Sequence, residues 1–237
     1  MTTDKVIIVS GATSGIGKAC AQALVQAGHK VRGFGRSTEK MEAACADTGA
    51  RISALDIRDA AACEALVAEV LDEHGRIDGL INAAGFLEME RTHKVSAESL
   101  DAQLDVLFKG AFRLTQLVLP AMRKQGGGLV LNIGSVSGRR PAPGHAVYGA
   151  AKAALEHLTR SLAAEYAPKG VRFLSISPGP VATDLLDDLS LQMLGRKVPL
   201  GRLGRPEEVA SLAVFLYSGQ ADFMTGTSLA IDGGAGL

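Results

Sequence analysis

The chain has 237 residues, which is enough for one domain with a substantial hydrophobic core. Lysine plus arginine and aspartate plus glutamate each number 25, so no bulk charge attracts nucleic acid or a membrane surface. The first apolar run begins at about residue 5, and no run approaches the roughly 20 residues that span a bilayer, so we expect a cytoplasmic protein without a signal sequence.

Apolar runs of strand length alternate with segments of helix length along the chain. Strands are predicted near residues 5–10, 30–34, 51–56, 78–82, 128–134, 171–176 and 228–231. Helices are predicted between them, notably at 17–28, 59–74, 100–124, 147–167 and 206–218. This pattern predicts an α/β fold: a single-domain, doubly wound parallel sheet (Rossmann-like) over residues 1–237, with helices on both faces. In such a sheet the ligand binds at the carboxyl ends of the strands.

A glycine-rich turn follows the first predicted strand. It reads Ser10-Gly11-Ala12-Thr13-Ser14-Gly15-Ile16-Gly17 and opens the first predicted helix. Free backbone N–H groups and the helix dipole both favour an anion at such a place, so the turn predicts a pyrophosphate site. A purely structural glycine turn is the alternative.

The end of the second predicted strand bears on the choice of cofactor. An acidic residue there would hold the ribose 2′-hydroxyl of NAD, but this chain has Gly35 followed by Arg36. A guanidinium can fork onto a 2′-phosphate, so NADP(H) is favoured over NAD(H). The alternative is that Arg36 is a solvated surface arginine.

The helix predicted at 147–167 carries Tyr148 and Lys152, which share a face because they are four residues apart. Ser135 lies on the loop before them. A unit positive charge roughly 4 Å from a phenol contributes about 4 kcal/mol at an effective dielectric near 20, or about three pKa units. We therefore expect Lys152 to lower the phenol pKa into the range for proton transfer, although the Tyr-x-x-x-Lys spacing alone is a weak signal.

Together these residues resemble the short-chain dehydrogenase/reductase family, in particular its 3-oxoacyl-(acyl-carrier-protein) reductase-like members, over nearly the whole chain. Four further stretches match the family in order and spacing: Asn82-Ala83-Ala84-Gly85, Pro178-Gly179-Pro180-Val181-Ala182-Thr183, Gly204-Arg205-Pro206-Glu207-Glu208-Val209-Ala210 and Asp232-Gly233-Gly234. Several matching motifs in the right order carry far more weight than any one of them.

The resemblance implies which residues contact the cofactor. They are Gly11, Thr13, Ser14, Gly15, Ile16, Gly17, Arg36, Asp56, Ile57, Asn82, Ala83, Gly85, Tyr148, Lys152, Pro178, Gly179, Val181 and Thr183. Asp56 would lie beside the adenine amino group, or it would cap the following helix instead. Thr183 would hold the nicotinamide carboxamide and so fix which ring face is presented.

The resemblance also implies hydride transfer between nicotinamide and a carbonyl carbon. Ser135 would hold the carbonyl oxygen, Tyr148 would donate the proton in reduction, and Lys152 would bind the nicotinamide ribose. Ser137 is a neighbouring serine, but the family places the catalytic serine thirteen residues before the tyrosine, which selects Ser135.

Two positions depart from the family pattern. Leu107 stands where the family commonly has an asparagine that anchors a water chain leading to the lysine. An apolar side chain cannot hold that water. Leu174 stands where a second asparagine, thought to be structural, is usual. These changes bear on the proton route and on turnover rate, and they leave cofactor binding untouched.

Substrate recognition is less defined by the sequence. The resemblance assigns pocket closure to residues 184–200, where Leu185, Leu186, Leu189, Leu191, Met193 and Leu194 suit a hydrophobic lid or, equally, a helix packed on its own protein. Arg139 and Arg140 are candidates for binding a carboxylate or phosphopantetheine, although solvated arginines are favoured. Arg123, Lys124 and Lys169 lie where reductases of acyl-carrier-protein substrates carry docking residues.

Three functions therefore compete. The leading one is NADPH-dependent reduction of a ketone such as a 3-oxoacyl thioester or a polyketide-like carbonyl. The second is oxidation of a secondary alcohol, and the third is a weakly catalytic cofactor-binding subunit that partners an active homologue. The family commonly forms homotetramers, so we expect one here. The three cysteines, Cys20, Cys45 and Cys63, lack ligand-like spacing, so we expect free thiols and no metal site.

Overall fold

The computed structural model describes residues 4–183 and 195–237. Seven strands form one sheet in the order β3-β2-β1-β4-β5-β6-β7, and every neighbouring pair is parallel. The strands are β1 (Val6–Ser10), β2 (Lys30–Gly35), β3 (Arg51–Ala54), β4 (Gly79–Asn82), β5 (Gly128–Ile133), β6 (Val171–Pro178) and β7 (Thr227–Ile231). The predicted strands and the predicted doubly wound parallel sheet are confirmed.

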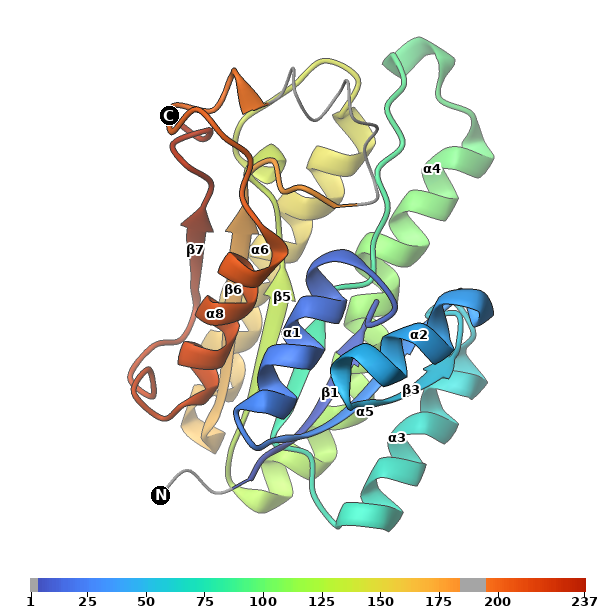
Figure 1. The fold of residues 1–237 in the computed structure, drawn as a ribbon, viewed down its shortest axis with the longest axis vertical. Coiled ribbons are helices and arrows are strands. Elements are labelled where there is room, and N and C mark those ends of the chain that lie inside the picture. The colour runs from blue at the N-terminus through green and yellow to red at the C-terminus, as the bar shows by residue number, and fades with distance from the viewer. Residues whose placement is uncertain (1–3, 184–194) are drawn as a thin grey trace.

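Helices cover both faces of this sheet (Figure 1). They are α1 (Gly15–Gln26), α2 (Thr38–Thr48), α3 (Ala60–His74), α4 (Ala97–Leu104), α5 (Ala111–Gln125), α6 (Ala146–Tyr166) and α8 (Pro206–Tyr217). Short 3-10 turns lie at Thr92–Lys94, Val136–Gly138 and Ala167–Lys169. Each helix in the described ranges is too short or too polar to cross a bilayer.

The hydrophobic core consists of two layers, one on each side of the sheet. Successive residues of β1 point to opposite faces, so Ile7 and Val9 pack under α1 and α8. Val6 and Ile8 pack on the other side, under α3, α5 and α6. A strand that is buried on both faces must be apolar at every position, which is why β1 reads as an unbroken hydrophobic run.

The strand order reverses direction on either side of β1, between β2 and β4. In open parallel sheets such a switch point leaves a crevice at the carboxyl ends of the strands, where ligands bind. Ser10, the last residue of β1, joins the end of β1 to the end of β4 by hydrogen bonds. Its hydroxyl donates to the carbonyl of Ile81 at 3.3 Å and accepts from the backbone N–H groups of Ala83 and Ala84, both at 3.1 Å.

The predicted helix over 100–124 is interrupted. A π-helical segment, Asp105–Gly110, separates α4 from α5. Its last residue lies very close to the loop after β3, since a Cβ added at Gly110 would be 2.8 Å from Cγ1 of Ile57. A π turn holds one more residue than an α turn, and such bulges are frequent at functional sites. Leu107, the position of the missing asparagine, lies inside this segment.

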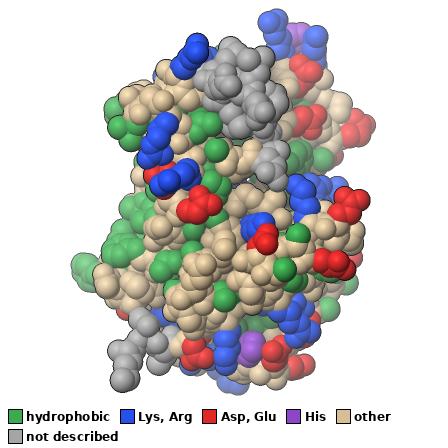
Figure 2. All heavy atoms as spheres, viewed as in Figure 1, with side chains coloured by type: hydrophobic (Ala, Val, Ile, Leu, Met, Phe, Trp, Pro, Cys, Tyr) green, Lys and Arg blue, Asp and Glu red, His purple; other side chains and the backbone are tan. Residues whose placement is uncertain are grey.

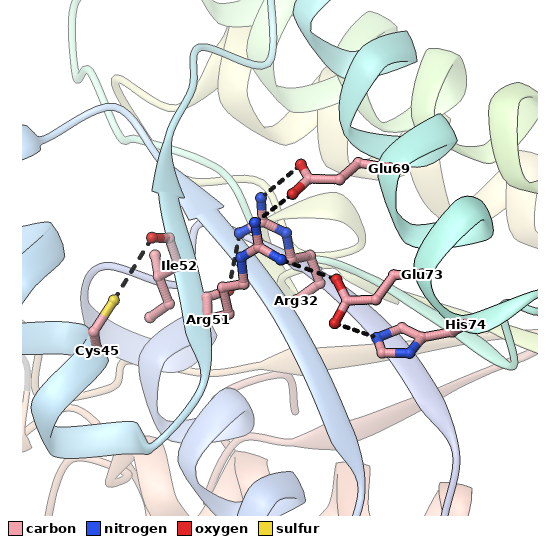
Figure 3. Close-up of polar contacts among 7 residues, drawn as sticks. All are labelled: Arg32, Cys45, Arg51, Ile52, Glu69, Glu73 and His74. Carbon is pink, nitrogen blue, oxygen red and sulfur yellow. Dashed lines mark hydrogen bonds and ion pairs between the residues drawn. The ribbon is translucent and has the colours of Figure 1, made fainter.

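The β2–β3 edge of the sheet is fastened to α3 by ion pairs (Figure 3). Arg32 of β2 is buried, and its Nη2 donates to Oε2 of Glu69 at 2.9 Å. Arg51 of β3 donates to Oε1 of the same Glu69 at 2.5 Å and to Oε2 of Glu73 at 2.9 Å. This network stabilises the edge that lies below the predicted adenine end of the cofactor site.

Candidate active site

The glycine turn between β1 and α1 brings three backbone segments together. Gly11 has φ of 71°, a left-handed conformation that favours glycine. A Cβ added at Gly17 would lie 2.3 Å from the carbonyl oxygen of Gly11, so the start of α1 packs directly on the turn. A Cβ at Gly11 would lie 2.9 Å from the backbone of Ala83, which places the β4 loop against the same turn.

The amino end of α1 suits an anion. Ser14 is its N-cap residue, but its side chain makes no capping hydrogen bond, and no acidic residue lies in the first turn. The first N–H groups of the helix and its dipole are therefore available to a pyrophosphate. Because the glycines of the turn have no side chains, a pyrophosphate can approach the backbone there. Thr183 approaches from the loop after β6, since a Cβ at Gly15 would lie 3.3 Å from Cγ2 of Thr183.

The carboxyl end of β2 has no space for an acidic side chain. A Cβ added at Gly35 would lie 2.5 Å from Oγ1 of Thr13, so Thr13 occupies the place where a carboxylate would begin. The neighbouring Arg36 is exposed, and its guanidinium lies 5.9 Å from the ring centroid of Phe86, which follows the Asn82–Gly85 loop. Arg36 thus contacts Phe86, which lies after β4, while its side chain remains exposed to solvent.

Asp56 does not cap α3. That position belongs to Asp59, whose side chain accepts from the N–H of Ala62 at 3.0 Å. Asp56 instead accepts from Arg58, from its backbone N–H at 2.9 Å and from its guanidinium at 2.6 to 3.1 Å. These hydrogen bonds, together with the charge of nearby Arg36, hold the pKa of the Asp56 carboxyl below its usual range, despite the opposing effect of burial.

Asn82 points into the protein. Its side chain is buried, and Nδ2 donates to Oδ1 of Asn132 at 2.8 Å and to Oγ1 of Thr115 at 3.3 Å. These contacts join β4 to β5 and α5. The groups that this loop presents to the crevice are therefore the backbone atoms of Ala83 and Gly85, the two other residues predicted there.

Ser135, Tyr148 and Lys152 meet above the carboxyl ends of β4 and β5. Ser135 follows β5 directly, and its side chain makes a hydrogen bond with Tyr148 on the first turn of α6. Lys152 is buried one turn further along, with Nζ 5.7 Å from the Tyr148 ring centroid. The same ammonium donates to the carbonyl oxygen of Ile133 at 2.7 Å.

The electrostatics of this group differ from the expectation. Burial raises the pKa of the Tyr148 phenol, and the hydrogen bond with Ser135 only partly opposes that rise. Burial also lowers the pKa of Lys152 to about 8. The expectation that Lys152 lowers the pKa of Tyr148 is therefore wrong for this structure, because desolvation is the largest effect on both groups.

Leu107 lies next to Lys152. A Cβ added at Gly85 would lie 3.2 Å from Cδ2 of Leu107 and 4.0 Å from Nζ of Lys152. The leucine is 1% exposed, so the surface beside the ammonium is apolar and closed. In this arrangement the ammonium is held by the Ile133 carbonyl.

A histidine that the sequence reasoning overlooked also lies at this site. His145 stacks edge-on against Tyr148, with ring centroids 6.1 Å apart, and its Nδ1 is 3.3 Å from Oγ of Ser137. Burial lowers the pKa of His145. Its position three residues before Tyr148, one helical turn away, was the available signal.

The remaining predicted residues occupy the β6 end of the crevice. Pro178 ends β6, the N–H of Gly179 donates to the carbonyl of Ile231 at 3.1 Å, and Val181 bridges to Gly204. Of the predicted substrate segment 184–200, residues 184–194 lie outside the described residues. In the described part of the chain, no group of three or more histidine, cysteine, aspartate and glutamate side chains could hold a metal ion.

The arginines after Ser135 bind the protein itself. Arg139 donates from Nε to Oε2 of Glu156 at 2.8 Å, and Arg140 donates to the carbonyl oxygen of Ala235. Both side chains are exposed, as expected for solvated arginines, and each also ties the loop to another element.

Comparison with known proteins agrees with this geometry. The profile of a family described as enoyl-(acyl carrier protein) reductase matches residues 11–236. The 3-oxoacyl-[acyl-carrier-protein] reductase FabG of Thermotoga maritima is 34% identical over 238 residues, covering 97% of each chain. The 2,3-dihydro-2,3-dihydroxybenzoate dehydrogenase of Escherichia coli is 36% identical over 246 residues, covering 98% of this chain and 97% of the relative.

A solved structure has the same fold. It is the 3-ketoacyl-(acyl-carrier-protein) reductase of Brucella melitensis in complex with NADH, which superposes with a TM-score of 0.94 at 30% identity and 100% coverage of both chains. The match of fold extends over the whole chain. The chain therefore belongs to the short-chain dehydrogenase/reductase family of NAD(P)-dependent oxidoreductases.

Proposed function

We propose that this protein is an NADPH-dependent reductase that converts a ketone, in particular a 3-oxoacyl thioester, into a secondary alcohol. The observation that carries the proposal is the meeting of Ser135, Tyr148 and Lys152 at the same sheet edge as the anion site of α1. The phosphate site would position the cofactor at the same sheet edge as the proton donor. A carbonyl bound between them could then receive both a hydride and a proton.

The chemistry requires a hydride and a proton, and the bound nicotinamide supplies the hydride. Ser135 orients the carbonyl by donating a hydrogen bond to its oxygen. Tyr148 then gives its phenolic proton to that oxygen as the C–O group becomes an alkoxide, which completes the alcohol. Lys152 is protonated below about pH 8, so its charge favours the phenolate that remains on Tyr148.

The preference for NADPH rests on the end of β2. Thr13 excludes an acidic side chain at position 35, so no carboxylate there repels a 2′-phosphate. Arg36 lies at the rim of the crevice, where its guanidinium lies over the Phe86 ring. The nearby Asp56 carboxylate is paired with Arg58. A guanidinium in this place can bind a phosphate through two parallel hydrogen bonds.

The 3-oxoacyl substrate class is supported by the names of the similar proteins, two of which act on 3-oxoacyl or 3-ketoacyl groups joined to acyl carrier protein. The basic residues predicted for carrier docking do not add to this support. Arg123 and Lys124 lie near the start of β5 and Lys169 near the start of β6, whereas Ser135 follows the end of β5. The six residues of β5 separate these places by about 20 Å.

The test is a panel of ketones mixed with the purified protein and NADPH, followed by the loss of NADPH absorbance. The panel contains acetoacetyl-CoA, a 3-oxoacyl thioester of acyl carrier protein, and a simple aryl ketone. We expect the thioesters to react fastest and Tyr148→Phe to be inactive on all of them. If NADPH is oxidised with none of these ketones, the proposed activity is wrong.

Oxidation of a secondary alcohol is the second candidate, favoured by the similarity to a dihydrodiol dehydrogenase. The same site runs in that direction when Tyr148 accepts the proton. Cofactor affinities discriminate between the two, because an oxidising enzyme is expected to bind NAD at least as tightly as NADPH.

A further inference from the structure

We propose that Glu156 is a positioning residue: through Arg139 it fixes the turn that carries Ser135 against the helix that carries Tyr148 and Lys152. Its consequence for turnover rests on the proposed function. Glu156 is on α6, one turn beyond Lys152, and its carboxylate oxygens accept hydrogen bonds from Arg139, Ser177 and Ser228.

The Ser135 turn lies along α6 in a fixed register. A Cβ added at Gly149 would be 2.7 Å from the carbonyl oxygen of Ser137, and one added at Gly138 would be 3.1 Å from the carbonyl carbon of Lys152. Arg139, the next residue, reaches Glu156 with an Nε–Oε2 distance of 2.8 Å. Positions 149, 152 and 156 form one stripe along the helix. Residues 137, 138 and 139 of the turn thus contact residues 149, 152 and 156 of α6 in that order. The third of these contacts is the ion pair.

Glu156 is a buried carboxylate with three donors. It is 4% exposed and accepts from Arg139, from Oγ of Ser177 at 2.5 Å and from Oγ of Ser228 at 3.2 Å. A buried charge is stable only when it is paired and hydrogen-bonded, so this carboxylate constrains all three partners. Because Ser177 is on β6 and Ser228 on β7, the Arg139 guanidinium is anchored to the sheet as well as to α6.

Packing alone does not hold the turn. A cavity of about 270 Å³ lies between the turn and the C-terminal segment, with Val136 and Arg139 on one side and Asp232 and Gly236 on the other. Side chains beside empty space can shift without a clash. The Arg139–Glu156 pair is therefore one of the polar contacts that restrain the turn beside the cavity, together with the hydrogen bonds of Arg139 to Ser228 and of Arg140 to Ala235. Among these contacts it is the one that joins the turn to α6.

Movement of the turn would change the reaction geometry. The close packing of Gly138 and Gly149 between the turn and α6 sets where Ser135 lies relative to Tyr148 on that helix. A misplacement of about 1 Å caused by a distant substitution can cost a hundredfold in rate. The cofactor phosphate site on α1 lies apart from this contact, so its affinity is expected to stay constant.

The first experiment separates kcat from cofactor binding. In Glu156→Gln and in Arg139→Ala, kcat for ketone reduction should fall at least about tenfold while the Kd of NADPH changes less than about twofold. Arg139→Lys keeps a positive charge and should recover most of the rate. The matched control is Glu165→Gln, the same change at an exposed position of the same helix, which should behave like the unmodified protein. Unchanged kcat in both Glu156→Gln and Arg139→Ala would overturn the proposal.

The second experiment needs no substrate, so it stands even if no ketone is reduced. The N–H of Ser137 donates to Oγ of Ser135 at 3.1 Å, and those of Arg139 and Arg140 donate to the carbonyl of Val136 at 3.0 and 2.8 Å. Hydrogen exchange of these amides should become faster in Glu156→Gln, with exchange in β1 unchanged. Equal exchange in the variant and the unmodified protein would show that the turn is held without Glu156.

Discussion

The strength of Tyr148 as an acid depends on its neighbours. Burial raises its pKa and the hydrogen bond with Ser135 lowers it, so the phenol keeps its proton at neutral pH and can donate it. Tyr148→Phe removes that proton and leaves the α1 phosphate site intact. We predict that turnover is lost while NADPH affinity stays nearly unchanged, which rate and binding measurements on the same preparation can check. Retained activity in Tyr148→Phe is the result that would refute the assigned mechanism.

Lys152 gives the reaction a pH dependence. Its pKa is lowered to about 8 by burial, so the ammonium is charged below that pH and becomes neutral as the pH rises through it. The charge favours the phenolate that forms on Tyr148, so its loss should slow reduction. We therefore predict that kcat falls as the pH is raised past about 8. A profile that stays flat to about pH 10 would mean that the charge of Lys152 does not assist the proton transfer.

Arg36 is the residue on which the cofactor preference depends. We predict that NADPH binds at least about tenfold more tightly than NADH, and that Arg36→Ala removes most of this preference, a loss of about 1.4 kcal/mol or more. Titration of both cofactors into both proteins measures the effect. Arg58→Ala is a useful comparison, because Arg58 is paired with Asp56 and its removal tests whether a second guanidinium contributes. Equal affinities in the unmodified protein would contradict the prediction.

At the scale of the elements, the π-helical segment Asp105–Gly110 decides what lies beside Lys152. It holds Leu107 against Gly85 and the ammonium, in a position where a polar side chain could hold water. If protons reached Tyr148 only through such a water, this protein would be slow. We predict instead that Leu107→Asn changes kcat less than about tenfold, or roughly 1.4 kcal/mol of barrier. The reason is that Lys152 is already held by the Ile133 carbonyl.

The measurement for this prediction is kcat against pH for both proteins on one accepted ketone. Some loss of stability is expected as well, because an asparagine placed at a site that is 1% exposed needs new hydrogen-bond partners. A hundredfold rise of kcat in the variant would show that the natural protein is impaired as a catalyst. The third function, a cofactor-binding subunit that partners an active homologue, would then become the better proposal.

The elements also show why some features could be predicted and others could not. The glycine turn and the pair Tyr148 and Lys152 are local in sequence, so their spacing revealed them. The sequence did not predict the π-helical segment, because its apolar residues continue the pattern of the flanking helices. Contacts such as Arg36 on Phe86 and Arg139 on Glu156 join elements that only the fold brings together. The sequence left the cap of α3 as an alternative role for Asp56 because Asp56 and Asp59 both precede the helix, and the structure gives that role to Asp59.

At the scale of the whole molecule, the two ends of the sheet have different roles. The carboxyl edge carries the residues of the proposed cofactor and reaction sites, while the amino edge carries Arg123, Lys124 and Lys169. An acyl carrier bound at that amino edge would be far from Tyr148 of the same chain. Any role of these residues in substrate delivery therefore requires another subunit, which makes the oligomeric state relevant to function.

We predict that this protein forms a homotetramer in which the face over α8 and β7 is one of the contact surfaces. Hydrophobic side chains gather over α8 in Figure 2, and two large ones are exposed there: Phe215 at 41% and Phe223, in the turn between α8 and β7, at 105%. Apolar side chains that gather into one exposed patch mark protein–protein contact sites. With 25 positive and 25 negative side chains, the chain has no net charge to oppose self-association. The two-fold contacts of such an assembly must be self-complementary, so one substitution acts twice at each interface.

Light scattering at micromolar concentration should report a mass of about four chains, and Phe223→Asp should lower it toward two by placing a charge in the contact. Glu165→Gln, an exposed change on α6, should leave the mass unchanged and so separates a loss of this interface from a general effect of surface substitution. A monomer in the unmodified protein would contradict the prediction, and an unchanged tetramer in Phe223→Asp would place the contact elsewhere.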